Sequence, residues 1–254
     1  MPLESPMNGI TFREDAPGAL LAAEGRCVAL ASTPELHWQR EGACLAAAIR
    51  EALDAAPDTP VLTGEQVHGS VVAEVTGAAP HEDFTEVPGV DGLWTRQRGV
   101  VLVARSADCV PVVLAAPEAG WLAVVHAGWR GTKGRIVEKS IDAAFEAGIV
   151  PESMHVWIGP CIGGDVYEVS PELAEEFAAE FASVGYRRNG RLLDLRRVNV
   201  LQASSRGVPE RNIAVSAHCT LRSSGRLPSY RRDGECRGQI YTAAILAKQT
   251  RERT

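Results

Sequence analysis

The most informative stretch of the chain is residues 107–132, which read ADCVPVVLAAPEAGWLAVVHAGWRGT. Two apolar runs, Val110–Ala116 and Trp121–Ala127, are separated by a Pro-Glu-Ala-Gly turn, and this pattern predicts a β-hairpin. We expect the numbers of paired residues to add up to about 236, within one, which places Cys109 opposite or diagonal to His126. Opposed side chains on one face lie about 4.5–5.5 Å apart, close enough to share a metal ion or a proton. A register slip of one residue would turn one of the two side chains away.

Outside the hairpin, the sequence predicts helices and strands in mixed order. A glycine-rich segment follows His126 and leads into a predicted helix over about 134–147, whose first N–H groups can attract an anion. The mixed order indicates an α/β or α+β fold with covered sheets, and we expect a single domain over residues 1–254. Further helices are expected at about 38–55, from Ser170 to near Gly185, at about 196–206 and at about 239–251, and strands at 70–75, 100–104, 156–158 and 213–216.

Composition excludes several classes of protein. The 254 residues are 45% hydrophobic and 23% charged, which argues against a disordered or fibrous chain. The longest apolar runs are too short for a bilayer and the N-terminal residues lack the features of a signal peptide, so we expect a cytoplasmic protein that does not bind membranes. The net charge of −6 argues against a nucleic-acid partner. Residues 187–254 nevertheless hold 14 Arg and one Lys against five acidic residues, which is either a solvated face or a source of groups for a small anionic substrate.

The predicted hairpin brings together two residues with chemical potential. Cys109 lies at the entrance of one strand, and His126 ends the other and opens a glycine loop. A cysteine and two histidines would form a site for Zn²⁺ with a fourth position open to water. His68, in the segment TGEQVHG, is a candidate third ligand, although a lone histidine is more often structural. Without a metal, the same pair fits a cysteine hydrolase in which Cys109 is the nucleophile and His126 the base.

Six short motifs carry a resemblance to a known family. They are QVHG at 66–69, DG at 91–92, ADCVPVVLA at 107–115, VVHAGWRGT at 124–132, IGPCIG at 158–163 and YRRDG at 230–234. In this order and spacing they resemble the YfiH-like family, also called the polyphenol oxidase or laccase-domain family, over about residues 60–240. The resemblance implies two packed mixed β-sheets flanked by helices, a fold similar to the catalytic domain of cytotoxic necrotizing factors. It also implies one zinc ion bound by His68, Cys109 and His126.

The resemblance further implies an enzyme that acts on small molecules. Members cleave adenosine, inosine, guanosine or methylthioadenosine with phosphate and deaminate adenosine. Some relatives instead act as peptidoglycan editing factors, which hydrolyse a wrongly incorporated serine from a UDP-MurNAc precursor. Older descriptions name copper oxidases, but a laccase needs many histidines, and only two of the six here lie in the metal-binding motifs. We therefore expect zinc before copper, and we keep a non-catalytic binding module as a further alternative.

Phosphorolysis would need groups that hold phosphate and the purine base. Arginine and glycine-rich backbone suit the phosphate, an aromatic ring suits the base, and a carboxylate can orient a ligand imidazole or handle a proton. The expected substrate-binding residues are Arg130, Gly131, Tyr230, Arg231, Arg232 and Asp233, and the expected catalytic residues are His68, Cys109, His126 and Asp108, with Asp233 sharing the carboxylate role proposed for Asp108.

Overall fold

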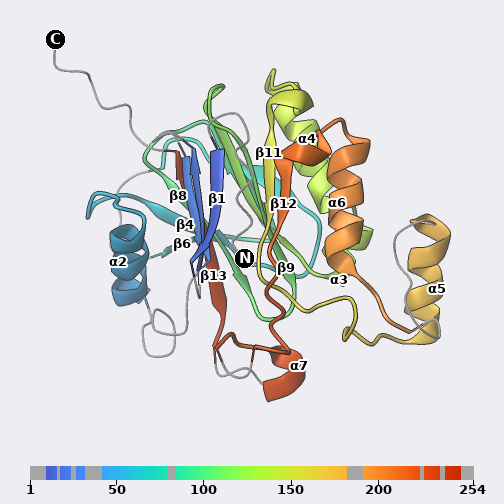
Figure 1. Ribbon diagram of the computed structural model, residues 1–254. Coiled ribbons are helices and arrows are strands. Elements are labelled where there is room, and N and C mark those ends of the chain that lie inside the picture. The colour runs from blue at the N-terminus through green and yellow to red at the C-terminus, as the bar shows by residue number, and fades with distance from the viewer. Residues whose placement is uncertain are drawn as a thin grey trace, which may run out of the picture.

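A computed structural model describes residues 10–15, 18–23, 27–31, 42–78, 84–181, 191–223, 226–234 and 238–246. Its strands form two mixed sheets (Figure 1). The seven-stranded sheet has the order β1 (Ile10–Asp15), β2 (Gly18–Ala23), β3 (Cys27–Ala31), β13 (Ile240–Leu246), β8 (Val101–Ser106), β4 (Val61–Gly64) and β6 (Phe84–Val87). The six-stranded sheet has the order β12 (Ile213–Val215), β11 (His155–Ile158), β9 (Val110–Ala116), β10 (Trp121–Ala127), β7 (Gly92–Thr95) and β5 (Val72–Glu74).

The two sheets pack against each other, and helices cover their outer faces (Figure 1). Leu102 and Ala244 of the first sheet share one core cluster with Leu122 and Val124 of the second. The outer face of the seven-stranded sheet is covered by α2 (Gly42–Ala52). The six-stranded sheet is covered by α4 (Ile136–Glu146) and α6 (Leu195–Ser205), with Phe177 of α5 (Pro171–Glu180) in the same cluster. The expected mixed α/β fold with two packed sheets flanked by helices is confirmed.

The central hairpin forms in the expected register. Trp121 pairs with Ala116 and His126 with Pro111, so the paired numbers add up to 237, inside the expected range. All residues of β9 and β10 are buried, because one face meets the other sheet and the opposite face meets the helices. Alternation on two buried faces explains why these strands read as continuous apolar runs. The hairpin therefore lies at the buried centre of the molecule.

Most other expected elements are present at nearly the expected bounds. Ser170 caps α5 by accepting a hydrogen bond from the Leu173 N–H, with Pro171 in the first turn, as its sequence predicts. Part of the first expected helix, residues 38–41, lies outside the described residues. Shorter elements complete the chain: α3 (Trp129–Lys133), η1 (Pro151–Ser153), η2 (Glu210–Asn212) and α7 (Tyr230–Asp233).

The expected helix at 239–251 is wrong. Residues Ile240–Leu246 form β13, which pairs with β3 on one side and β8 on the other, in the middle of the seven-stranded sheet. The alanines of this segment favour a helix. The segment is nevertheless a strand, because it forms hydrogen bonds with a neighbouring strand on each side and its side chains are buried on both faces of the sheet. Residues 247–254 lie outside the described part of the chain.

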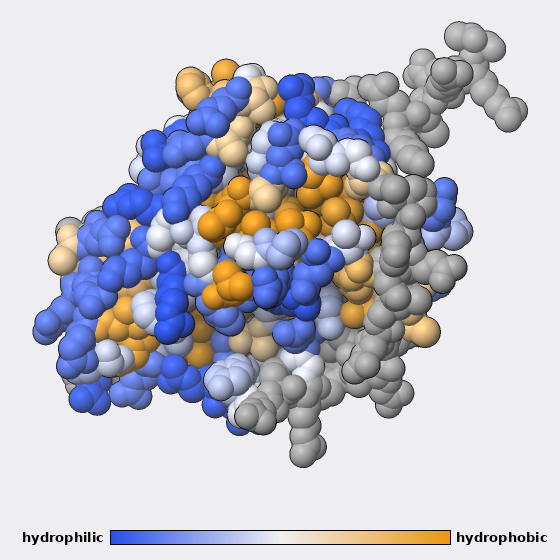
Figure 2. All heavy atoms as spheres, turned by 180° about the vertical axis from the view of Figure 1, so that it is seen from behind, coloured by the Kyte–Doolittle hydropathy of each residue, from blue (hydrophilic) through white to orange (hydrophobic). Residues whose placement is uncertain are grey.

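The surface is mostly polar, with apolar side chains gathered in places. Seen from behind, charged and polar side chains cover much of the molecule and an apolar area lies near its middle (Figure 2). Among the described residues, the large apolar side chains that are exposed are Val67, Val71, Phe145, Val150, Val215 and Tyr230. None of the described helices has the length and apolar character that crossing a membrane requires.

Candidate metal centre and its cavity

Cys109 and His126 meet at the open end of the hairpin. His126 pairs with Pro111, so Cys109, two residues before that proline, lies diagonally across the strand pair from the imidazole. Diagonal neighbours on one face are within reach of each other. The candidate ligand atoms of Cys109, His126 and His68 all lie within 4.8 Å of one another. The geometry thus brings together the three residues that the sequence singles out.

His68 reaches this cluster from a loop that follows β4. Gln66 and His68 both have positive φ, of 59° and 60°, which is costly for residues other than glycine unless the surroundings hold them there. The Gln66 side chain provides one such restraint, because it donates to the Arg105 carbonyl at 2.6 Å and accepts from the Arg105 N–H at 2.8 Å. The His68 ring consequently stands edge-on to the His126 ring, with centroids 5.1 Å apart.

Asp91 is a functional residue that the sequence did not assign to a role. Its carboxylate lies 2.9 Å from His126 Nδ1, and both residues are buried. The contact leaves Nε2 of His126 as the nitrogen that is free to act as a metal ligand. The DG motif at 91–92 was a signal for this position, but nothing in the local sequence says which histidine it would meet.

The electrostatics of the cluster favour an anionic sulfur. Burial opposes charge on Cys109, but hydrogen bonds and charge from His126 and His68 outweigh it and lower the thiol pKa to about 7. Burial also opposes charge on His126, yet Asp91 and Cys109 raise its pKa to about 9. Burial works against ionised Asp91, but hydrogen bonds from His126 and Gly69 lower its pKa below the usual range.

The donor set and the space around it fit a metal ion. One thiolate and two imidazoles are ligands that Zn²⁺ prefers, and three protein ligands leave a position open for catalysis. Gly128 keeps this space clear, since a Cβ there would lie 3.1 Å from Cys109 Sγ and 3.6 Å from atoms of both imidazoles. The residues present can therefore hold zinc, and the same set is compatible with copper.

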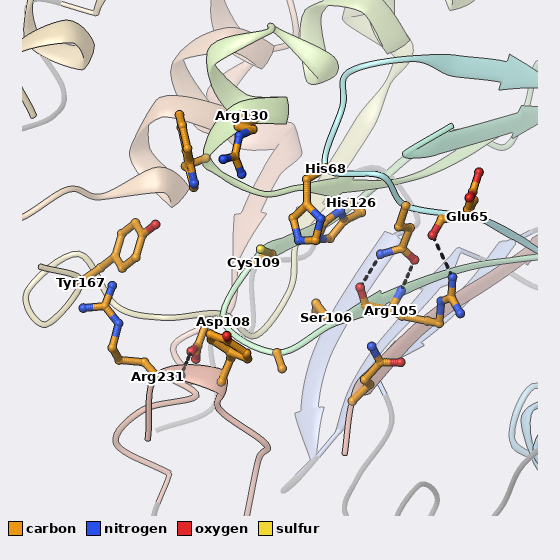
Figure 3. Close-up of a pocket in the computed structure, with 15 residues that line it drawn as sticks. Glu65, His68, Arg105, Ser106, Asp108, Cys109, His126, Arg130, Tyr167 and Arg231 are labelled. Atoms are coloured by element: carbon orange, nitrogen blue, oxygen red, sulfur yellow. Dashed lines mark hydrogen bonds between the residues drawn. The ribbon is translucent and has the colours of Figure 1, made fainter. Parts of the chain in front are cut away.

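The cluster opens into a cavity of about 740 Å³ (Figure 3). Arg130, Tyr230 and Arg231, three of the expected substrate-binding residues, line it. The Arg130 guanidinium lies 4.3 Å from the centre of the Trp129 ring, and that of Arg231 lies 5.4 Å from the centre of the Tyr167 ring. The complete lining is Glu65, Gln66, His68, Arg105, Ser106, Ala107, Asp108, Cys109, His126, Trp129, Arg130, Tyr167, Tyr230, Arg231 and Gln239.

Gly131, Arg232 and Asp233 are not among the residues that line the cavity. Gly131 instead allows α3 to pack against the His68 loop, because a Cβ there would lie 2.7 Å from the Gly69 carbonyl oxygen. Arg232 turns toward its own chain and donates to the carbonyls of Thr220 and Leu227. Asp233 pairs with Arg232. The expectation that both arginines of the pair face the substrate is therefore wrong for Arg232.

Asp108 lines the cavity but does not orient an imidazole. Its carboxylate accepts hydrogen bonds from the Thr220 hydroxyl and, at 2.7 Å, from the Arg231 N–H. It therefore fixes the start of α7, and with it Tyr230 and Arg231, against the hairpin. The orienting role expected for Asp108 or Asp233 is filled by Asp91, because this residue immediately precedes β7, which pairs with β10, and its carboxylate is the one that meets His126 Nδ1 among the described residues.

Tyr167 lines the cavity and is another residue whose role the sequence does not predict. Its ring packs against the core cluster under the six-stranded sheet and against Arg231. Burial raises the pKa of its phenol to about 12, so the hydroxyl remains protonated at neutral pH. It follows the IGPCIG motif by four residues, and that proximity was the available signal.

Comparisons with known proteins agree with this architecture. Residues 43–247 match the family model described as multi-copper polyphenol oxidoreductase laccase. The purine nucleoside phosphorylase YlmD of Geobacillus stearothermophilus is 36% identical over 187 residues, which cover 69% of this chain and 68% of that protein. Its crystal structure matches with a TM-score of 0.78 at 29% identity, over 93% of this chain and 99% of that one.

Two other proteins extend the comparison. The adenosine deaminase RL5 from an unknown prokaryotic organism is 36% identical over 167 residues, or 63% of this chain and 64% of that protein. The crystal structure of the Bacillus licheniformis hypothetical protein YfiH shares the fold, with a TM-score of 0.77 at 23% identity over 92% of this chain and 98% of that one.

Proposed function

The chain belongs to the YfiH-like, or laccase-domain, family, and from that premise we propose that it is a zinc-dependent purine nucleoside phosphorylase with adenosine deaminase activity. The observation that carries the proposal is one cavity lined by both a Cys-His-His cluster and three arginines, of which Arg130 and Arg231 are the ones that hold phosphate in this proposal. The relatives named purine nucleoside phosphorylase and adenosine deaminase support the class of substrate. The substrates are accordingly a purine nucleoside and phosphate, both small molecules.

In this proposal His68, Cys109 and His126 hold the zinc ion. Zinc in such a site acts as a Lewis acid and lowers the pKa of water toward neutrality, which is the chemistry that deamination needs. Asp91 keeps the proton of His126 on Nδ1. Gly128 leaves room beside the sulfur, and the apolar hairpin beneath excludes water from the underside of the site.

Arg130 and Arg231 bind the phosphate. Guanidinium groups match phosphate geometry, and both of these are steadied by an aromatic ring. Arg231 is restrained further because its Nη1 donates to the Glu168 carbonyl at 3.0 Å. Tyr230, which lines the same cavity, stacks on the purine base.

A laccase activity does not follow from the family's description. Laccase chemistry requires a blue-copper site together with a trinuclear copper cluster, which together use many histidines. Within the described ranges, one group of three or more metal-ligating side chains is close enough to bind an ion, and it contains two histidines. The donor set supports a single metal ion, and zinc is the better match.

A cysteine hydrolase is the second candidate, and one observation favours it. Cys109, His126 and Asp91 are arranged in the order of a nucleophile, a base and an orienting carboxylate. His68 separates the two candidates, because a metal site needs it and the Cys-His pair does not. A His68→Ala variant that retains full activity and is insensitive to chelators would favour the hydrolase over the zinc enzyme.

The test is to incubate zinc-loaded protein with adenosine, with and without phosphate, and to identify the products by chromatography. Adenine and ribose 1-phosphate should form only when phosphate is present, and inosine should report deamination. Both activities should be lost in Cys109→Ala, which controls for contaminating enzymes. If the intact protein turns over no nucleoside, the proposal fails, and a UDP-MurNAc-serine conjugate becomes the substrate to test for the peptidoglycan-editing alternative.

A further inference from the structure

Asp91 contacts both histidine-bearing segments of the metal centre. One carboxylate oxygen lies 2.9 Å from His126 Nδ1. The other accepts the Gly69 N–H at 2.6 Å, and Gly69 is the residue that follows His68. Only 2% of Asp91 is exposed, so water does not compete for either oxygen. A single buried side chain thus joins a strand end and a loop that are far apart in the sequence.

The backbone around Asp91 holds this carboxylate in place. The His126 N–H donates to the Asp91 carbonyl at 2.7 Å, and the next residue, Gly92, pairs with Val125 in the sheet. A Cβ on Gly92 would lie 2.6 Å from the Val125 side chain, so the close contact of β7 with β10 depends on glycine here. Asp91 therefore cannot move without disturbing the strand that carries His126.

The contact with His126 decides which ring nitrogen faces the cluster. A carboxylate can only accept a hydrogen bond, so the imidazole must carry its proton on Nδ1, and the lone pair of Nε2 is left for a metal. An asparagine at this position could accept from Gly69 and donate to Nδ1. That arrangement would place the imidazole proton on Nε2 and block the ligand atom.

The contact with Gly69 restrains the second histidine. His68 is exposed and has a positive φ, so its position depends on the loop around it. Gln66 holds the loop on the N-terminal side through the Arg105 backbone. Asp91 holds it on the C-terminal side, immediately after His68. Together the two anchors fix the backbone from which the imidazole projects.

We propose that Asp91 is a positioning residue shared by both ligand histidines, and that it sets the Nε2 of His126 and the loop of His68 for one metal ion. This inference rests on the metal site of the proposed function but not on its substrate. A protein that binds zinc and fails to turn over nucleosides would refute the proposed activity and leave the role of Asp91 open to the measurements below.

The test compares zinc affinities, measured by competition with a chromogenic chelator, for the wild-type protein, Asp91→Asn and Asp91→Ala. Asp91→Asn should bind zinc about 10–100-fold more weakly, the usual effect of removing a group that orients a ligand. Asp91→Ala should be weaker still, because it also releases the Gly69 N–H. Glu138→Gln is the matched control: it removes the charge of another buried carboxylate, on α4, which pairs with Arg135 and Arg206 and contacts neither histidine, and it should change the affinity by no more than about twofold.

The proposal is overturned if Asp91→Asn binds zinc as tightly as the wild-type protein, or if Glu138→Gln loses as much affinity as Asp91→Asn. Circular dichroism and thermal unfolding of the metal-free proteins identify a variant that fails to fold. A measurement on the zinc-loaded wild-type protein then decides: long-range ¹H–¹⁵N spectra, assigned with a His126→Gln variant, should show the His126 proton on Nδ1 and the metal on Nε2. The opposite arrangement refutes the proposal. A wild-type protein that binds no zinc refutes the metal site and this inference together.

Discussion

His126 lies on a fully buried strand pair and Cys109 immediately precedes its first strand, whereas Tyr230, 60% exposed, lies on the four-residue helix α7. We call the part of the cavity lined by Cys109, His126 and His68 the metal end, and the part lined by Tyr230, Arg130 and Arg231 the cationic end. The metal end is fixed by sheet pairing and by Asp91. The cationic end is fixed by two hydrogen bonds to Asp108 from Thr220 and Arg231, and by ring contacts.

This difference predicts two kinds of mutational effect. The geometry of a metal site tolerates little displacement, so changes at the metal end should act on metal affinity and on the chemical step. In the proposed function, groups at the cationic end bind a substrate that can adjust its own position, so changes there should act mainly on KM. The following experiments test this division.

The largest effect is expected for Cys109→Ser. A hydroxyl is a much weaker zinc ligand than a thiolate. Replacing a residue that merely orients a ligand lowers metal affinity about 10–100-fold, and the loss for Cys109→Ser should be larger than that. Nucleoside turnover should fall with it. Cys44→Ser, which changes an exposed cysteine on α2, is the control and should leave both quantities unchanged. A Cys109→Ser protein with normal zinc content would show that the metal end is misassigned.

The pH dependence of zinc binding should be the next largest effect. His126 has a pKa raised to about 9, so it is protonated at pH 8 and must release its proton when a metal binds. Cys109, with a pKa lowered to about 7, is already largely ionised there. Zinc affinity should therefore rise about tenfold per pH unit between about 7 and 9 and level off above about 9. Competition titrations across this range check the slope, and a flat profile would contradict the coupling of Asp91, His126 and Cys109.

The same division explains what the sequence could predict. Cys109 and His126 were placed together correctly because they lie on one hairpin, whose turn and apolar runs define the register within one residue. The role of Asp91 does not follow from the sequence, because this residue lies just before β7, on the other side of β10, and no local pattern determines which strands become neighbours. The family resemblance includes the DG motif at 91–92, but the contact of Asp91 with His126 becomes visible only in the folded structure.

The cationic end was harder to predict because it is assembled from short, distant segments. Arg231 and Arg232 are adjacent in sequence and chemically identical, yet one lines the cavity and the other binds backbone carbonyls. The direction of a side chain on a four-residue helix depends on what that helix packs against. For β13, helix-forming alanines similarly misled the interpretation, since neighbouring strands on both sides determined the structure.

This pair of arginines offers a direct comparison at the cationic end. Arg231→Gln should raise the KM for phosphate about tenfold, because a charge-assisted hydrogen bond contributes about 1.5–3 kcal/mol. The lower part of this range applies, because Arg231 also donates a hydrogen bond to the Glu168 carbonyl. Arg232→Gln should leave the phosphate KM unchanged and lower the free energy of unfolding by about 1–3 kcal/mol, because carbonyls of Thr220 and Leu227 lose their donor. Steady-state kinetics and denaturant titrations of both variants separate the two effects. Equal KM changes in both would mean that the helix as a whole, and not the Arg231 side chain, binds phosphate.

The smallest effect is expected for Tyr230→Ala. Stacking of a base on an aromatic ring contributes about 1–3 kcal/mol. Because Tyr230 is exposed, we expect a contribution near the smallest value of this range, so the KM for adenosine should rise about fivefold. The KM for phosphate and the zinc affinity should not change. Tyr230→Phe keeps the ring and should behave as the wild-type protein, whereas a Phe variant as impaired as the Ala variant would assign the contact to the hydroxyl. An effect of Tyr230→Ala on zinc affinity would mean that the two ends are coupled through Arg231 and Asp108, which hold α7 beside Cys109.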